Sequence, residues 1–260
     1  MKLTNHRSED SADSRRRSEP HIAAVIPALD EAPSIARVIE GLRRQALLAT
    51  GDVIVVDNGS TDGTGKIARR AGARVVREER RGYGYACLAG VLAARDAAVI
   101  VMLDGDAADD PDDLSRVLEP LLKGKADLVV GSRTPGSRAQ GSMTWQQIIG
   151  NHLAAFLMRA IYGVRVSDVG PFRAIRRDDL LALEMREMTY GWPSEMIVKS
   201  IRAGYRYCEV PVRYHRRLGV SKVGDTLVGS LKVGWTIIST ILRYSRWTPR
   251  KKKTTAKVNR

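Results

Sequence analysis

Short apolar runs alternate with amphipathic stretches through the first half of the chain. Five short apolar runs predict strands at 22–26, 53–56, 74–77, 98–103 and 127–130. Between them, apolar residues at helical spacing predict helices at 33–48, 85–94 and 112–123, and after the turn at 58–63. This alternation predicts an α/β fold, with a mostly parallel sheet and helices on both faces.

The second half is less regular. Its patterns predict helices at 145–162 and 194–203, a strand at 205–212 and a Gly-Pro loop at 168–172. A last helix at 227–244 is amphipathic, through the apolar residues Leu227, Leu231, Trp235, Ile238 and Leu242. Two interpretations stay open for this helix: packing on its own domain, or docking on a membrane surface. No segment has the apolar length that spans a bilayer.

Charge adds an expectation about partners. The net charge of +14 favours an anionic partner, namely nucleic acid, a membrane surface or a phosphorylated substrate. We expect a polar tail at 1–20, one domain at 21–215, the amphipathic helical segment at 216–246 and a basic tail at 247–260. The two cysteines, Cys87 and Cys208, indicate neither a disulfide framework nor a zinc site and favour a reducing compartment.

The strongest local motif is acidic. Asp104-Gly105-Asp106 directly follows the predicted strand 98–103, and Asp109 adds further negative charge. Two carboxylates at the end of a parallel strand repel each other, and a hard divalent cation relieves that repulsion while neutralising a diphosphate. Mg²⁺ or Mn²⁺ suits such oxygen ligands. Asp112 and Asp113 instead suit the start of the next helix.

Two further loops carry acids. The first predicted strand runs into Pro27-Ala28-Leu29-Asp30-Glu31, and the second into Asp57-Asn58. Ligands of such sheets bind beyond the carboxyl ends of the strands, where these loops meet. Because carboxylates accept hydrogen bonds from a base and a ribose, the three loops together predict a nucleotide pocket.

From about His21 to Tyr244 the chain resembles a family 2 glycosyltransferase of the GT-A fold. The matching segments are VIPALDEAPSI, VVDNGSTDGT, GYGYA, MLDGDAADDP, VVGSR, GPFRAIRR, YGWPSEMIVKSIRAGYRYCEVPV and RRLGVSKV. They are similar to those of dolichol-phosphate mannosyltransferase and polyprenyl-phosphate glucosyltransferases. The resemblance implies a Rossmann-like nucleotide-diphospho-sugar transferase fold. It also implies an inverting, metal-assisted enzyme that moves a sugar from a UDP- or GDP-sugar to a polyprenyl or dolichyl phosphate.

The resemblance also implies roles for matching residues. Those expected at the nucleotide sugar are Pro27, Ala28, Leu29, Glu31, Asp57, Asn58, Gly84, Asp104, Gly105 and Asp106. Those expected at the reacting sugar and its acceptor are Asp104, Asp106, Asp168, Arg173 and Glu195, with Arg133 and Arg138 at the acceptor phosphate. Asp106 would hold the metal, with Asp104 and Asp109 as further ligands. Ala108 stands where related mannosyltransferases often carry a metal-binding Gln, so Asp109 or water would have to substitute.

The acceptor decides the mechanism. A phosphate acceptor is already an anionic nucleophile, whereas a hydroxyl needs a general base, for which Glu195 or Asp168 is the candidate. The alternative function is therefore a soluble transferase with a small-molecule or carbohydrate acceptor. A non-catalytic basic module for nucleic acid is a third hypothesis, which the acidic loops oppose. We expect a cytoplasmic protein, peripheral at the cytoplasmic face of an anionic membrane through its C-terminal helix and basic tail.

Overall fold

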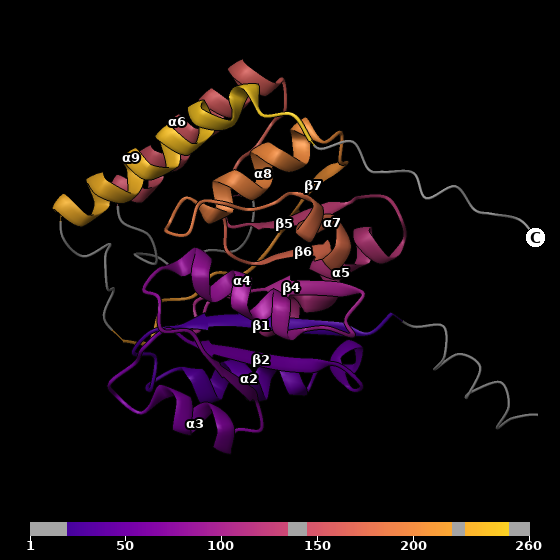
Figure 1. Cartoon of the computed structure of the whole chain (residues 1–260), viewed down its shortest axis with the longest axis vertical. Helices are drawn as coiled ribbons and strands as arrows, with labels where there is room; N and C mark the ends of the chain where they lie inside the picture. Colours follow the sequence, from indigo (N-terminus) through magenta and orange to yellow (C-terminus); the bar gives the residue numbers. More distant parts are fainter. Residues whose placement is uncertain (1–19, 135–144, 220–226, 250–260) are drawn as a thin grey trace, which may run out of the picture.

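The structure, a computed structural model, describes residues 20–134, 145–219 and 227–249. A seven-stranded sheet forms its centre, and helices cover both faces (Figure 1). The strand order is β3-β2-β1-β4-β6-β5-β7. The strands are β1 (Ile22–Ala28), β2 (Asp52–Asp57), β3 (Arg74–Arg77), β4 (Val99–Met102), β5 (Leu128–Ser132), β6 (Arg173–Arg176) and β7 (Tyr207–Pro211). The predicted α/β architecture is confirmed.

One strand runs against the others. β6 pairs antiparallel with both β4 and β5, whereas the other pairings are parallel. Neither β6 nor the helix that follows it, α7 (Arg177–Ala182), was predicted. The sequence of β6 is RAIR, and only its place between two strands buries Arg173. A strand of four residues with a charge at each end carries too little alternation to be recognised.

The direction of the chain reverses beside β1. From β1 the chain goes to β2 and β3 on one side and then returns to β4 on the other. Loops that follow β1 and β4 therefore diverge, and a crevice for ligands opens at the carboxyl ends of the strands. Register aligns these ends, because Ala28 pairs with Asp57 and Val25 with Met102. The three acid-bearing loops consequently meet at one edge of the sheet, as expected.

Each face of the sheet carries its own apolar core. In β1, Ala24 and Ile26 belong to one core and Ala23 and Val25 to the other, as alternating side chains require. The first core packs under α2 (Ile35–Arg43), α3 (Thr64–Arg70) and α5 (Leu114–Leu122). The second packs under α4 (Tyr83–Ala93) and α8 (Trp192–Arg202). The helices predicted at 33–48 and 112–123 are shorter than expected, because a 3-10 turn, η1 (Ala46–Leu48), follows α2 and another, η2 (Pro111–Asp113), precedes α5.

Two further helices form an outer layer over α8. The predicted helix at 145–162 is α6 (Trp145–Tyr162), and the last predicted helix is α9 (Leu227–Arg243), followed by η3 (Tyr244–Arg246). They lie side by side at the top of Figure 1. In the described ranges no helix has both the length and the apolar character needed to cross a membrane.

Candidate active site

The loop after β4 brings three carboxylates together in a small volume. Asp106 and Asp109 are buried, and Asp104 is partly exposed. Asp106 Oδ1 accepts a hydrogen bond of 3.0 Å from the amide of Ala108, whereas Asp109 Oδ1 is buried with no hydrogen-bond partner in the described structure. Ala107 adopts a left-handed conformation, with φ of 60°, which a non-glycine residue rarely takes. Such strain is typical of a functional loop.

Burial makes this negative charge costly. Burial, with the neighbouring Asp106 carboxylate adding to it, raises the pKa of Asp104 to about 6. Burial also raises the pKa of Asp109 well above its ordinary value, and Asp104 and Asp106 contribute in the same direction. A cation in the loop would therefore stabilise the ionised carboxylates.

These oxygens fit Mg²⁺ or Mn²⁺, since both take carboxylate ligands and the buried Asp109 Oδ1 is unpaired. Among the described residues, no group of three or more His, Cys, Asp or Glu is arranged to hold a metal ion. Mg²⁺ is commonly held by one or two carboxylates together with substrate phosphates and water. Asp106 and Asp104 match that arrangement, in which a diphosphate completes the coordination.

A segment from the far end of the domain lies over the acidic loop. The amides of His215 and Leu218 donate to the carbonyls of Ala108 and Asp106, over 2.8 and 2.9 Å. Arg217 Nη2 lies 2.7 Å from Asp106 Oδ2, and its side chain is 36% exposed. Arg217 had no predicted role, although it lies in the matching segment RRLGVSKV. Its contact with the acidic loop depends on the fold.

The loop after β1 borders the candidate site beside the acidic loop. The amide of Glu31 donates to Thr64 Oγ1 over 2.8 Å, and Asp30 adopts a left-handed φ of 52°. Ser34 Oγ donates to the carbonyl of Gly105 over 2.7 Å and so ties this loop to the acidic one. The structure therefore brings together the expected nucleotide residues Pro27, Ala28, Leu29, Glu31 and Gly105.

The loop after β2 is held by side-chain hydrogen bonds. Asp57 Oδ1 accepts from the amide of Ser60 over 2.8 Å. Asn58 is buried: its Nδ2 donates to the carbonyls of Glu78 and Arg80, and its Oδ1 accepts from the amide of Gly82. Asn58 thus supports the loop rather than facing a ligand.

Tyr83 connects helix α4 to the acidic loop. Its hydroxyl donates to Asp104 Oδ1 over 3.0 Å. Burial, followed by the nearby Asp104 charge, raises the pKa of Tyr83, which keeps this hydroxyl protonated as a donor. Gly84, expected at the nucleotide sugar, instead lies against the backbone of 187–188, where a Cβ would come within 2.5 Å of the Glu187 carbonyl. The GYGYA segment was noted in the sequence, but no role was predicted for Tyr83, the first of its two tyrosines.

Arg133 and Asp168 form a buried ion pair beside the acidic loop. Arg133 Nε and Nη2 lie 2.6 Å from the two Asp168 oxygens, and Asn151 Nδ2 donates to Asp168 Oδ1 over 2.8 Å. Burial opposes the charge of Asp168, but the Arg133 guanidinium outweighs it and lowers the pKa of the carboxyl. Arg133 also lies over the ring of Tyr214, 4.9 Å from its centroid. Both charges are thus fixed in place.

The remaining expected residues do not all face a ligand. Arg173 is buried and donates to the carbonyls of Gly170 and Pro193, so it supports the loop that carries Asp168. Glu195 is fully buried and lies 2.7 Å from Lys199 Nζ, a position that does not support the expected role near an acceptor. Arg138 lies outside the described residues.

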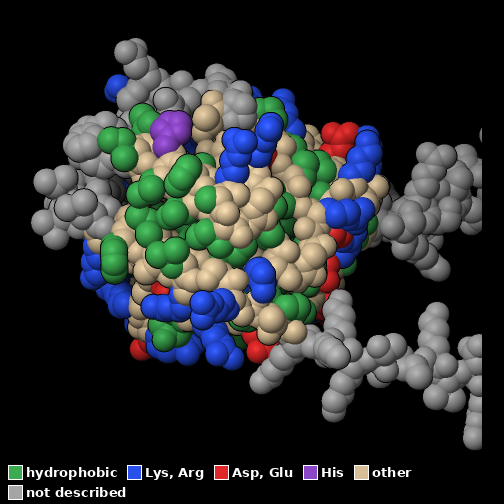
Figure 2. All heavy atoms as spheres, turned by 90° about the horizontal axis from the view of Figure 1, so that it is seen from above, with side chains coloured by type: hydrophobic (Ala, Val, Ile, Leu, Met, Phe, Trp, Pro, Cys, Tyr) green, Lys and Arg blue, Asp and Glu red, His purple; other side chains and the backbone are tan. Residues whose placement is uncertain are grey.

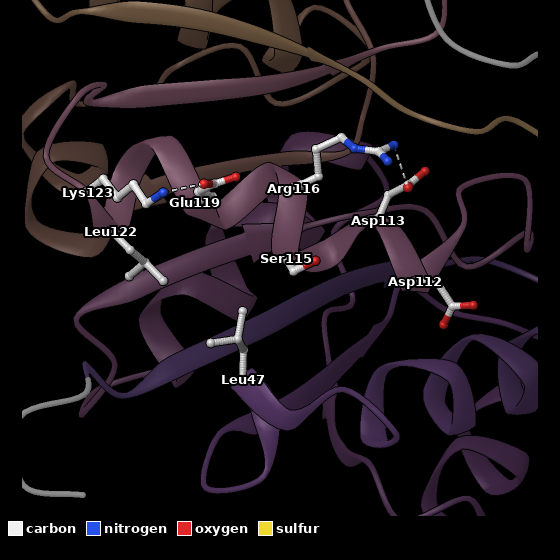
Figure 3. A pocket seen from close by; sticks show the side chains of 8 residues that line it. All are labelled: Leu47, Asp112, Asp113, Ser115, Arg116, Glu119, Leu122 and Lys123. Atoms are coloured by element: carbon white, nitrogen blue, oxygen red, sulfur yellow. Dashed lines mark hydrogen bonds and ion pairs between the residues drawn. The ribbon is translucent and has the colours of Figure 1, made fainter. Parts of the chain in front are cut away.

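A separate depression lies on the outer side of α5 (Figure 3). Its charged side chains already have partners: Arg116 pairs with Asp113, Lys123 pairs with Glu119, and Asp112 accepts a hydrogen bond from Gln45. It shares no residue with the acidic loop, and none of the expected site residues lines it. The sheet edge, rather than this depression, carries the candidate chemistry.

Comparison with protein families identifies the chain. Residues 23–183 match the model of glycosyl transferase family 2. The chain is a family 2 glycosyltransferase. This membership makes the protein an enzyme and excludes the hypothesis of a non-catalytic binding module.

Relatives of this glycosyltransferase include both uncharacterised and named enzymes. An uncharacterised glycosyltransferase of Mycobacterium tuberculosis is 37% identical, over 84% of this chain and 98% of its own length. An undecaprenyl-phosphate mannosyltransferase of Micrococcus luteus is 31% identical, over 83% of this chain and 92% of its own. A dolichyl-phosphate hexose transferase of Haloferax volcanii is 33% identical, over 85% and 94%. These relatives bear out the resemblance read from the sequence.

Solved structures confirm the GT-A fold of this glycosyltransferase. Glucosyl-3-phosphoglycerate synthase from Mycobacterium tuberculosis, in complex with Mn²⁺, uridine diphosphate and glucosyl-3-phosphoglycerate, superposes with a TM-score of 0.72. The match covers 96% of this chain and 88% of that one, at 22% identity. At this identity the likeness shows the shared fold alone.

Proposed function

We propose that this glycosyltransferase transfers a sugar, with inversion and metal assistance, from a UDP- or GDP-sugar to a polyprenyl-type phosphate. The observation that carries the proposal is the pairing of opposite charges at one edge of the sheet. The carboxylates of Asp104 and Asp109 lie within electrostatic reach of Arg133, and Arg217 contacts the buried Asp106 directly. A metal-diphosphate donor and an anionic acceptor require such a combination. The names of the relatives support the same acceptor class.

On the donor side, Asp106 and Asp104 would hold Mg²⁺ or Mn²⁺, with Asp109 behind them. The bound metal would neutralise the charge that develops on the departing nucleoside diphosphate. Arg217 now neutralises Asp106, at 2.7 Å, and would pair with a diphosphate oxygen once a metal takes over that carboxylate. Leu29, Glu31 and Asp57 would border the nucleoside.

On the acceptor side, a phosphate needs a fixed cation and no general base. Arg133 would supply that cation through Nη1, because Asp168 binds its Nε and Nη2, and Asn151 binds Asp168 in turn, so that the guanidinium is fixed. A hydroxyl acceptor would need Asp168 or Glu195 as its base. Asp168 is engaged by Arg133, and Glu195 by Lys199, so neither oxygen set is available to a hydroxyl. The phosphate acceptor is therefore the better fit.

The activity is tested with purified protein, undecaprenyl phosphate, MnCl₂ or MgCl₂, and radiolabelled UDP-glucose or GDP-mannose. We expect label in the organic phase in the presence of metal, and its loss with chelator or in Asp106→Asn. Glucose and 3-phosphoglycerate replace the lipid in parallel reactions. Product with one of these acceptors but none with the lipid would refute the proposed acceptor. Glu119→Gln is the control variant, and it should form as much product as wild type.

We also propose that α6 and α9 contact an anionic membrane at the cytoplasmic face. Figure 2 shows hydrophobic side chains gathered over these helices, with Lys and Arg beside them. Phe156 on α6 is 65% exposed and Trp235 on α9 is 71% exposed. Ile241 of α9 is buried in the core, so one side of this helix packs on the domain while another side exposes Trp235. Asn151 of α6 bonds Asp168, which links the apolar face to the acceptor pair.

Vesicle binding tests this surface. Burying a large apolar side chain is worth about 1.5–3 kcal/mol, so Phe156→Ser and Trp235→Ser should each weaken partitioning into phosphatidylglycerol vesicles by about tenfold or more. Leu122→Ser, an exposed residue of α5, is the matched control and should change nothing. Equal partitioning of wild type and both α6/α9 variants would contradict the membrane surface.

A further inference from the structure

Glu195 and Lys199 form a second buried ion pair, on α8 and away from the proposed acceptor. Both side chains are 0% exposed, and Glu195 Oε1 lies 2.7 Å from Lys199 Nζ. The spacing of four residues puts them on the same side of the helix. A pair this deeply buried must satisfy its remaining hydrogen-bonding groups, and the partners it uses show what it holds.

Those partners are backbone groups of one loop, residues 183–188. Glu195 accepts hydrogen bonds from the amides of Arg186 and Glu187, at 2.9 and 2.7 Å. Lys199 donates to the carbonyls of Leu183 and Glu184, at 3.0 and 2.7 Å. Glu184 has a left-handed φ of 47°, a conformation that needs support from its surroundings. The ion pair thus holds the loop in two ways: Glu195 binds backbone amides of the loop, and Lys199 binds its backbone carbonyls.

The same loop packs against the turn 82–84, where α4 begins. The amide of Gly84 donates to the carbonyl of Met188 over 3.0 Å. A Cβ on Gly82 would come within 2.3 Å of the Met188 carbonyl, and one on Gly84 within 2.5 Å of the Glu187 carbonyl. The backbones of loop 183–188 and turn 82–84 are in direct contact, with no side chain between them. A displacement of the loop would therefore also displace the turn. Tyr83 lies in this turn and donates its hydroxyl to Asp104.

The C-terminal segment closes the other side of the pair. Lys199 Nζ lies 4.7 Å from the centroid of the Tyr244 ring and 5.1 Å from that of Trp247. Thr240 of α9 lies close to the residue before α8, since a Cβ on Gly191 would come within 2.5 Å of its hydroxyl. The ion pair therefore lies between loop 183–188 and the C-terminal residues Tyr244 and Trp247, in contact with both.

We propose that Glu195 and Lys199 are positioning residues of the donor site, which hold loop 183–188 against the turn 82–84 and so keep the Tyr83 hydroxyl on Asp104. This inference rests on the proposed donor role of Asp104. Neither side chain reaches the donor itself. Their effect on transfer is carried by the loop, the turn and the tyrosine.

A double-mutant cycle between Glu195→Gln and Tyr83→Phe tests this route. Glu195→Gln keeps the side-chain size but removes the charge that faces the two loop amides and Lys199. Each single variant should raise the KM for UDP-glucose or GDP-mannose by about tenfold, the scale of a hydrogen bond to a charged group. The double variant should fall within about twofold of the worse single variant, because both changes remove the same contact. Additive losses, about a hundredfold together, would overturn the proposal.

Amide hydrogen exchange gives a readout that needs no substrate. Peptides covering 82–90 should exchange faster in Glu195→Gln than in wild type. Asp127→Asn is the matched control: Asp127 pairs with Arg206 and Arg176 at the opposite end of β5, so its loss should leave these peptides unchanged. Unchanged exchange in Glu195→Gln would overturn the positioning role.

Two further results distinguish a failure of this inference from a folding defect of the variant and from a failure of the proposed function. If Glu195→Gln does not fold, Tyr244→Phe removes a hydroxyl that bonds Glu195 without unpairing Lys199, and it should raise exchange at 82–90 to a smaller degree. If wild type turns over neither donor, the proposed function fails. In that case the exchange measurement still decides whether the ion pair holds the turn.

Discussion

The Arg133–Asp168 pair allows a quantitative test of the site. Asp168→Asn removes one charge from a pair whose side chains are 13% and 0% exposed. Arg133 keeps its proton in this variant despite burial, because a guanidinium group stays protonated even without its acidic partner. Removing one partner of a buried pair costs about 3–5 kcal/mol, and the residual exposure of Arg133 favours the lower end, about 3 kcal/mol. In a chain of this size that is a fall in Tm of about 6–12 °C.

Urea denaturation followed by tryptophan fluorescence measures this change as a shift of the midpoint at constant slope. Adding Arg133→Met to Asp168→Asn should restore much of the lost stability, because no unpaired charge then remains buried. Glu119→Gln, which breaks the exposed pair with Lys123, should leave the unfolding curve unchanged. A loss below about 1 kcal/mol for Asp168→Asn, or a further loss on adding Arg133→Met, would refute the reasoning.

Two other predictions concern the acidic loop. Arg217→Gln should raise the KM for the nucleotide sugar by about fivefold to tenfold, a modest effect because the Arg217 side chain is 36% exposed. The free energy of unfolding should stay nearly unchanged. An unaltered KM in steady-state assays would contradict the donor role of Arg217. Asp104 has a folded pKa of about 6 against 3.8 ordinarily, so the folded state binds more protons between these values. Without metal, its contribution to stability should therefore fall as pH rises from about 4 to 6. Thermal unfolding across this range should show the trend in wild type and a weaker trend in Asp104→Asn, because burial still raises the pKa of Asp109 in the variant. Excess MnCl₂ should suppress the trend in wild type, and identical pH profiles for wild type and Asp104→Asn would contradict the prediction.

Local pattern was sufficient for most of the sheet. β1, β2 and β4 are short apolar runs flanked by polar loops, and the structure has each within about two residues of its predicted bounds. β6 was missed because its burial depends on its neighbours. RAIR has no apolar run, and the buried Arg173 donates to the carbonyls of Gly170, in the adjoining loop, and Pro193, in α8. Such compensation has no local signal.

The candidate site divides in the same way. Asp104, Asp106 and the loops after β1 and β2 were predicted together, because parallel strands bring their carboxyl ends to one edge of the sheet. Arg217 and Tyr83 were missed, since each reaches the acidic loop from a segment distant in the chain. Glu195 was expected near an acceptor, and its side chain instead lies within an ion pair inside α8.

The alternation of strands and helices in the first half of the chain, and with it the edge where three acidic loops meet, was determined by the sequence alone. Periodicity is a local property, and chain connectivity then restricts the sheet to few topologies. Tertiary structure decided which charges face a ligand and which neutralise one another. Asp168 and Glu195 both look like candidate bases in the sequence, yet each is buried against a cation, Arg133 or Lys199. The physical reason is that the cost of burying a charge depends on partners and exclusion of water, which exist only once distant segments have packed.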